Sequence, residues 1–173
     1  MKSIPNAEEC IEILKKNGCS RSVINHCKAV RDVAIKIAEK ANANVELVEA
    51  SALLHDIGRS KTHGIRHAIE GAKIIKKIGL SSKIVKIIER HIGAGLPAKE
   101  AKKLGLPAKN YIPITLEEKI VCHADSLIEN SKKQNIEKEI EQALMNSHRE
   151  YANRLVVLHK ELSEICGIDV NKI

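Results

Sequence analysis

The sequence has almost no aromatic residues. Its 173 residues include two tyrosines but no phenylalanine and no tryptophan. Proteins that stack successive nucleic-acid bases on aromatic rings need several such side chains, so this composition argues against that class of module. Isoleucine, leucine, valine and alanine must therefore build the core, and a hydrophobic content of 43% is enough for one.

Paired cysteine motifs and long apolar runs are also missing. The five cysteines are odd in number and show no CxxC spacing, which predicts free, packed thiols in a reducing cytoplasm. No stretch is apolar enough over sufficient length to cross a membrane, and the first residues lack a secretory signal pattern. We therefore expect a cytoplasmic protein that does not bind membranes.

The charge is strongly basic. The net charge is +7 and the isoelectric point about 9.2, which favours anionic partners such as nucleotides and phosphate esters. The lysines are scattered over many helical faces, a pattern more typical of a solvated surface than of a nucleic-acid interface. A small phosphorylated substrate is thus the favoured partner and nucleic acid the less favoured one.

Apolar residues recur at helical spacing along nearly the whole chain, and no segment alternates long enough for a strand. The pattern predicts helices over about 7–16, 20–41, 44–56, 64–78, 82–92, 98–104, 115–130 and 135–166, the last with a break near 146–147. Thr115 and Glu118 predict a capping box. The prediction is an all-α, single-domain helical bundle over residues 1–173, with no linker or repeat.

Two segments stand apart from the rest of this bundle. Residues 93–114 are rich in glycine and proline and carry several lysines, so we expect a lid loop that attracts a polyanionic substrate. Residues 135–166 carry one long apolar stripe. That stripe permits packing on the domain or pairing of two subunits as a homodimer.

Six ionisable side chains fall on the apolar stripes of five predicted helices. They are His26, His55, Asp56, His67, His91 and Asp125. One inward histidine is ordinarily a hydrogen-bonded core residue, but six such groups in one small bundle indicate a metal site. Imidazole and carboxylate are common ligands of divalent metals, and no lysine or arginine is placed to compensate both aspartates.

The order of these residues resembles a known family. His26, then His55-Asp56, then Asp125 resembles the H…HD…D pattern of the HD-domain superfamily of metal-dependent phosphohydrolases, and residues 55–58 read HDIG. Residues 67–72 read HAIEGA, which is similar to the HxxxGA signature of members that bind two metals, and His91 matches the histidine that follows it. The resemblance covers about residues 20–130, which we take as the core of the domain.

The resemblance implies a dinuclear centre. One divalent metal would be held by His26, His55, Asp56 and Asp125, and a second by His67 and His91, with Asp56 bridging them. Members of the family use Mn, Fe, Mg, Ni, Co or Zn. The arrangement is similar to diadenosine tetraphosphate hydrolases and to HD-GYP cyclic-dinucleotide phosphodiesterases, but the GYP signature is absent.

The implied reaction is hydrolysis of a phosphoester or phosphoanhydride of a nucleotide by metal-activated water. Asp56, Asp125 and Arg59 would act in catalysis; Arg59 suits a phosphate oxygen through its fork of donors and is equally compatible with a helix C-terminal cation. Lys61, His63 and Arg66 are further candidates for substrate binding. Two alternatives stay open: an HD-fold di-iron oxygenase and a non-catalytic, metal-bound nucleotide-sensing module.

Overall fold

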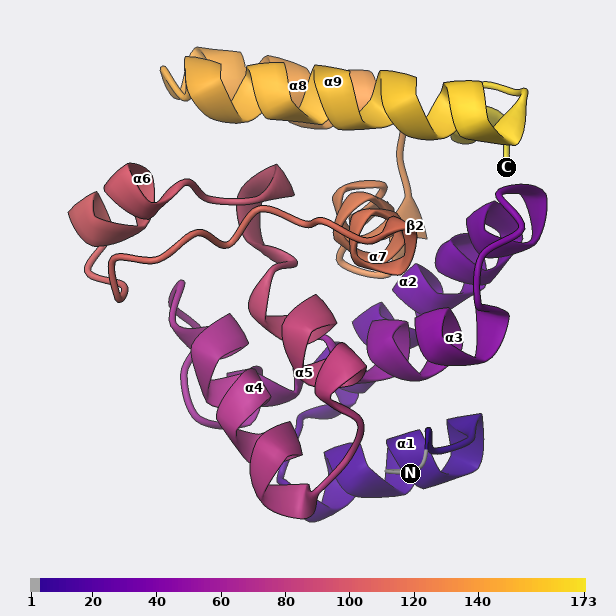
Figure 1. Ribbon diagram of the computed structural model, residues 1–173, viewed down its shortest axis with the longest axis vertical. Coiled ribbons are helices and arrows are strands. Elements are labelled where there is room, and N and C mark those ends of the chain that lie inside the picture. Colours follow the sequence, from indigo (N-terminus) through magenta and orange to yellow (C-terminus); the bar gives the residue numbers. More distant parts are fainter. Residues whose placement is uncertain (1–3) are drawn as a thin grey trace.

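The computed structural model describes residues 4–173, and helices make up most of it (Figure 1). The α-helices are α1 Ala7–Lys16, α2 Arg21–Lys40, α3 Val45–Leu54, α4 His67–Ile78, α5 Ser82–Glu89, α6 Ala98–Lys103, α7 Leu116–Ser126, α8 Ile136–Met145 and α9 Arg149–Cys166. Short 3-10 turns are η1 Ile57–Ser60, η2 Ile92–Ala94 and η3 Val170–Lys172. The predicted all-α class is confirmed.

Polar caps fix several of these helix starts as the sequence indicates. Ser20 accepts the amide of Val23 and so begins α2. Thr115 accepts the amide of Glu118 at 3.2 Å, but the Glu118 carboxylate does not return to Thr115. It accepts the amide of Ile114 at 2.6 Å and two contacts from Arg90 at 3.0 and 2.9 Å, so it joins the end of α5 to the start of α7.

The predicted helix over 115–130 is too long. α7 ends at Ser126, and an antiparallel pair of two-residue strands follows, β1 Ile128–Glu129 and β2 Lys132–Lys133. Asn130 turns the chain with φ of 60°, a left-handed conformation that asparagine tolerates. Strands of two residues are too short to produce a readable alternation, which explains why the pattern concealed them.

The main core lies where α2, α3, α5 and α7 meet. α2 packs against both α3 and α7, and α4 packs against α5 and η1. α8 and α9 lie side by side across the bundle, in Figure 1 along the top, and α9 contacts α7 and η2. The predicted break between the last two helices is present, with Ser147 at φ of 60°. No helix within residues 4–173 combines the length and apolarity needed to span a membrane.

The segment expected to form a lid has a small core of its own. Its buried residues and one from α4 form a separate cluster of Ile69, Leu96, Ala101, Leu106 and Tyr111. Two arginines tie the segment to neighbouring helices: Arg154 of α9 contacts both carboxylate oxygens of Glu100 at 2.7 and 2.9 Å, and Arg66 donates to the Gly105 carbonyl at 3.0 Å. The segment is therefore packed against α4 and α9.

Candidate metal centre

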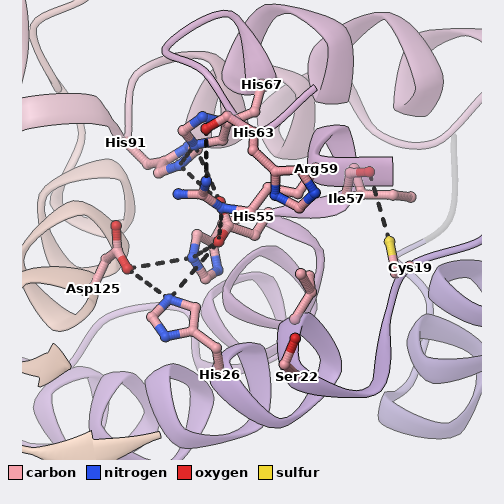
Figure 2. A network of polar contacts seen from close by, with 12 residues as sticks. Cys19, Ser22, His26, His55, Ile57, Arg59, His63, His67, His91 and Asp125 are labelled. Atoms are coloured by element: carbon pink, nitrogen blue, oxygen red, sulfur yellow. Dashed lines mark hydrogen bonds and ion pairs between the residues drawn. The ribbon is translucent and has the colours of Figure 1, made fainter. Parts of the chain in front are cut away.

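The ends of five helices bring the six predicted ligands together (Figure 2). His26 comes from the first half of α2 and Asp125 from the last turn of α7. His55 and Asp56 follow α3, His67 begins α4, and His91 follows α5. The side chains of His55, Asp56, His67 and His91 are buried, whereas those of His26 and Asp125 are 18% and 29% exposed.

Asp56 stands between two groups of histidines. Its Oδ2 atom faces His26 Nε2 at 3.8 Å and His55 Nε2 at 3.7 Å. Its Oδ1 atom faces His67 Nε2 at 3.1 Å and His91 Nε2 at 3.6 Å. One carboxylate thus has one oxygen directed at each pair of imidazoles, as a bridging ligand requires.

Asp125 completes the group on the Oδ2 side. Its Oδ1 atom lies 2.9 Å from His26 Nε2 and 3.4 Å from His55 Nε2. The potential ligand atoms of His26, His55 and Asp125 all lie within 4.8 Å of one another, and so do those of His55, Asp56 and His91. The Nε2 atoms of His67 and His91 are 3.0 Å apart.

Backbone carbonyls set the tautomer of all four imidazoles. The Nδ1 atoms of His26, His55, His67 and His91 lie 2.8, 2.7, 2.9 and 2.6 Å from the carbonyl oxygens of Asn130, Ala52, Gly64 and Ile88. A carbonyl can only accept, so each Nδ1 must carry the proton. In a neutral ring the opposite atom, Nε2, then presents a lone pair, and all four lone pairs point at the two carboxylates.

Two glycines let the backbone close around this cluster. A Cβ on Gly58 would lie 1.8 Å from the His67 carbonyl oxygen, so only glycine permits η1 to pass so near the start of α4. A Cβ on Gly71 would meet Ile88 at 3.0 Å and the Gly58 amide at 3.2 Å. The missing side chain of Gly58 therefore lets His67 approach Asp56.

The electrostatics of the cluster favour a cation. Burial opposes the charge on Asp56 and Asp125, but the neighbouring imidazoles, His55 foremost, outweigh it and hold the pKa of both carboxyls well below the usual range. The same carboxylates overcome the burial of His55 and raise its pKa well above the ordinary value. Positive charge is therefore strongly attracted to this point, whether as a proton or as a metal ion.

The donor set fits divalent metal. Among residues 4–173, the buried His55 Nε2 and Asp56 Oδ1 atoms have no hydrogen-bond partner, which is costly for buried polar atoms. Imidazole and carboxylate atoms that converge on one point are the arrangement that a divalent ion satisfies. The buried residues therefore suit metal better than a closed hydrogen-bond network.

Arg59 reaches the cluster from its mouth. Its Nε atom lies 2.6 Å from Asp56 Oδ2, and Nη1 donates to the His63 carbonyl at 3.2 Å (Figure 2). A cavity of about 360 Å³ opens here, lined by Ser22, Val23, His26, Asp56, Arg59, His63, Asn130 and Ser131. Arg59 and His63 thus lie at the mouth, and their role in substrate binding stays a prediction.

The other predicted substrate residues lie elsewhere. Lys61 lines a separate groove with Asn17, Lys73 and Lys77. Arg66 donates a hydrogen bond to the Gly105 carbonyl. The sequence analysis missed Ser22, Asn130 and Ser131, which line the mouth. Ser22 lies four residues before His26 on the same helix, so helical spacing could have predicted that it faces the mouth. Asn130 and Ser131 lie in the short hairpin, where no helical spacing applies.

A second histidine cluster lies nearby on the same helix. His123 of α7 is buried, and its Nε2 atom is 2.9 Å from His159 Nδ1 of α9. The other nitrogen of His159 contacts Asp169 at 3.0 Å. Burial, and then the charge of His159, lowers the pKa of His123 to about 3. These groups form a chain rather than a convergent set of ligands.

Comparisons with known proteins agree with the sequence and the fold. The HD domain profile matches residues 23–130. The chain is 44% identical over 173 residues to a tRNA (cytidine(56)-2'-O)-methyltransferase of Thermoplasma volcanium, and it spans 51% of that relative. It is also 45% identical over 166 residues to an uncharacterized protein of Methanocaldococcus jannaschii, covering 91% of this chain and 97% of the relative.

The fold resembles one solved domain in particular. The HD domain of the L. monocytogenes phosphodiesterase PgpH has a TM-score of 0.58 and 20% identity to this chain, with 90% of this chain and 95% of the other covered. A second structure of that domain, in complex with cyclic-di-AMP, has a TM-score of 0.57 and 19% identity, with 89% and 96% covered. At this level of identity the likeness shows the shared fold.

Proposed function

Because this chain belongs to the HD-domain phosphohydrolase superfamily, we propose that its histidine–aspartate cluster binds divalent metal and hydrolyses a phosphoester or phosphoanhydride of a nucleotide. One observation carries the proposal. Four imidazole Nε2 lone pairs and two carboxylates converge, and every Nδ1 proton is held by a backbone carbonyl. A divalent cation satisfies imidazole and carboxylate atoms arranged in this way.

We propose that the cluster holds two ions. His26, His55, Asp125 and Asp56 Oδ2 would hold one, and His67, His91 and Asp56 Oδ1 the other. When bound, divalent metal supplies a water of lowered pKa as the nucleophile and a Lewis acid for the phosphoryl oxygens.

The protein groups at the mouth orient the substrate. Arg59 holds Asp56 with Nε and the His63 carbonyl with Nη1, so its side chain is fixed with guanidinium N–H groups beside the cluster. These donors can bind an equatorial phosphate oxygen and stabilise the charge that develops there. The neighbouring imidazoles hold the pKa of Asp125 below its usual range, so its carboxylate stays ionised at neutral pH and can orient a water by accepting a hydrogen bond from it.

A metal and substrate panel tests the proposal. The purified chain is analysed for bound metal, stripped with chelator, reloaded with each divalent ion, and assayed on phosphomonoesters, phosphodiesters and dinucleotides. Metal-dependent release of phosphate or nucleotide is the expected result. If no ester or anhydride is turned over with any ion, the non-catalytic sensing module becomes the better account.

The di-iron oxygenase has the same ligand order and needs its own test. The protein is loaded with Fe²⁺ without oxygen, and oxygen uptake is then measured in the presence of candidate substrates. We expect no substrate-dependent uptake, because the mouth carries Arg59, a donor suited to phosphate. Stoichiometric uptake coupled to carbon oxidation would favour the oxygenase.

RNA is a second candidate substrate, favoured by one of the relatives. The whole chain corresponds to about half of a protein named as a tRNA methyltransferase, so a domain like this one can belong to an RNA-modifying protein. The net charge of +7 is compatible with RNA, and hydrolysis at a strand end needs no aromatic stacking platform. The test is hydrolysis of oligoribonucleotides that carry 5'-phosphate, 3'-phosphate or 2',3'-cyclic phosphate ends.

A further inference from the structure

A groove outside the metal cluster remains unassigned. It has a volume of about 680 Å³, within the range of roughly 300–1,000 Å³ typical of small-molecule sites. Its walls come from the end of α6, the start of α9 and the chain around η2, and none of the six predicted metal ligands lines it. In Figure 1, α6 lies below the N-terminal end of α9, with the chain that leaves α5 between them and the bundle.

Two residues of the groove wall are neighbours in the chain of His67 and His91. Ile92, which lines it, directly follows His91, and Ile65, which also lines it, lies two residues before His67. Tyr151 stands on the opposite wall, where its hydroxyl donates to Glu139 at 2.8 Å. Burial first, and then the charge of Glu139 and its hydrogen bond, raises the pKa of Tyr151, so its hydroxyl stays protonated.

The walls are held at a fixed separation. Arg154 of α9 contacts Glu100 of α6 through two nitrogens at 2.7 and 2.9 Å, and its Nε atom donates to the Gly93 carbonyl at 3.4 Å. Bidentate pairs of this kind fix geometry as well as charge. The groove is thus formed before any ligand enters, which lowers the entropic cost of binding.

The lining combines an apolar strip with cations. Ile65, Ile92, Leu96 and Leu104 supply apolar surface, and Leu104 is 48% exposed. Arg154 and Glu100 neutralise each other. Lys103 and Arg149 are exposed and form no hydrogen bond or ion pair within the described residues 4–173. Apart from the pair of Arg154 and Glu100, the groove is thus lined by two cations and one carboxylate, that of Glu150.

We propose that this groove binds the nucleoside attached to the scissile phosphate, with the base on the apolar strip and Lys103 and Arg149 attracting the phosphate chain. This rests on the proposed function and adds the place where the nucleoside would bind. A flat heterocycle buries well against Ile and Leu side chains without an aromatic partner, and the cations complement an anionic ligand. The start of α9, beyond residues 23–130 of the HD match, would then contribute to specificity.

A pair of chromogenic esters tests the groove. Adenosine 5'-triphosphate esterified at its γ-phosphate with 4-nitrophenol, called the adenosine ester below, and methyl 4-nitrophenyl phosphate share a leaving group, and only the first carries adenosine and a phosphate chain. The double variant Lys103→Glu/Arg149→Glu should raise KM for the adenosine ester by about tenfold and leave kcat/KM for the methyl ester within about twofold. The control Lys102→Glu/Lys160→Glu makes the same change of charge outside the groove and should leave both esters unchanged.

The apolar strip has its own variant. Leu104→Ser should raise KM for the adenosine ester by about threefold to tenfold through lost apolar contact. Val157→Ser is the matched control, because Val157 is an exposed apolar side chain that does not line the groove. Equal effects of the groove and control variants on the adenosine ester would overturn the proposal.

A binding measurement separates this proposal from the proposed hydrolysis. Adenosine 5'-monophosphate is titrated into the full chain labelled at Ile, Leu and Val methyls, with Mg²⁺ or Zn²⁺ present. The methyl signals of Ile92, Leu96 and Leu104 should shift while those of Val157 do not, and methyl phosphate should shift none of them. Shifts confined to Val23 at the cluster mouth would overturn the groove as the nucleoside site, whatever the outcome of the turnover assays.

Discussion

Two clusters of histidine and aspartate lie on the same helix and differ in what they can do. Asp125 and His123 are two positions apart on α7, so they project about 200° apart around its axis. Around Asp125, imidazoles from four other segments direct Nε2 at shared carboxylates. Around His123, the contacts run in series to His159 and Asp169.

The difference lies in where the ring protons go. In the convergent cluster each Nδ1 proton is held by a carbonyl, so the Nε2 atoms face one another as acceptors. In the serial cluster, Asp169 accepts from His159 Nε2, whose Nδ1 then accepts from His123 Nε2. A proton lies in each contact, and a metal ion has no place there. Residue types alone therefore do not identify a metal site.

Removing the bridging carboxylate should give the largest effect. Asp56→Asn keeps the shape but halves the negative charge of the cluster, so we expect loss of bound metal and a fall in activity on the order of 10³-fold or more. Metal content by mass spectrometry and kcat/KM on the best ester measure it. An Asp56→Asn protein that keeps full metal content and full activity would contradict the bridging role.

Titration of His123 in the serial cluster should instead make the free energy of unfolding depend on pH. The pKa of His123 is lowered to about 3 in the fold, below its value in an unfolded chain of about 6.5. The buried neutral ring therefore contributes stability that is fully present above about pH 6.5 and is lost as pH falls towards about 3, on the order of 1.4 kcal/mol for each pKa unit of displacement.

Urea unfolding of chelator-treated protein across this pH range measures the effect. His123→Gln removes the titrating group, so its free energy of unfolding should change less steeply with pH than that of the unchanged chain. Parallel curves for the two proteins would show that His123 does not carry the loss. Metal content of the variant at neutral pH should stay unchanged, in contrast to Asp56→Asn.

The close approach that builds the convergent cluster can be tested at Gly58. A methyl group there would meet the His67 carbonyl oxygen at 1.8 Å, so Gly58→Ala should cost about 1–3 kcal/mol of stability. The shift of His67 should also weaken metal binding. Gly64→Ala is the control, because its Cβ would meet only Thr62 at 3.7 Å; equal costs for the two variants would show that the close approach is not the cause.

The smallest effect is expected at the exposed end of the serial cluster. Asp169 is exposed, and such contacts contribute about 0–1 kcal/mol. Asp169→Asn should therefore leave metal content and activity unchanged and lower the melting temperature slightly, as measured by calorimetry. Loss of metal from this variant would mean that the two clusters are coupled through α7.

Much of this molecule could be predicted from its sequence because the signals are local. Helical periodicity and the caps at Ser20 and Thr115 predicted the helices closely, and the break near Asn146 is present. The inward positions of the six ionisable residues also followed from periodicity, and the structure brings their side chains together. Their role as metal ligands stays a prediction.

What the sequence concealed depends on contacts between distant segments. His26 is oriented by the carbonyl of Asn130, 104 positions away, in a hairpin too short to show alternation. Gly58 is needed because of a carbonyl on another helix. Arg154 pairs with Glu100 across the groove between α6 and α9. The sequence around these two residues does not predict that contact.

The anchoring of the four imidazoles by main-chain oxygens has a consequence for how this centre can vary. Any amino acid supplies the same carbonyl, so the identities of Asn130, Ala52, Gly64 and Ile88 can change without altering the acceptor that each histidine meets. The path of the backbone therefore provides these four acceptors, and the side chains of the four residues do not. Engineering that aims to retune the centre must therefore move backbone, because side-chain replacement cannot remove these acceptors.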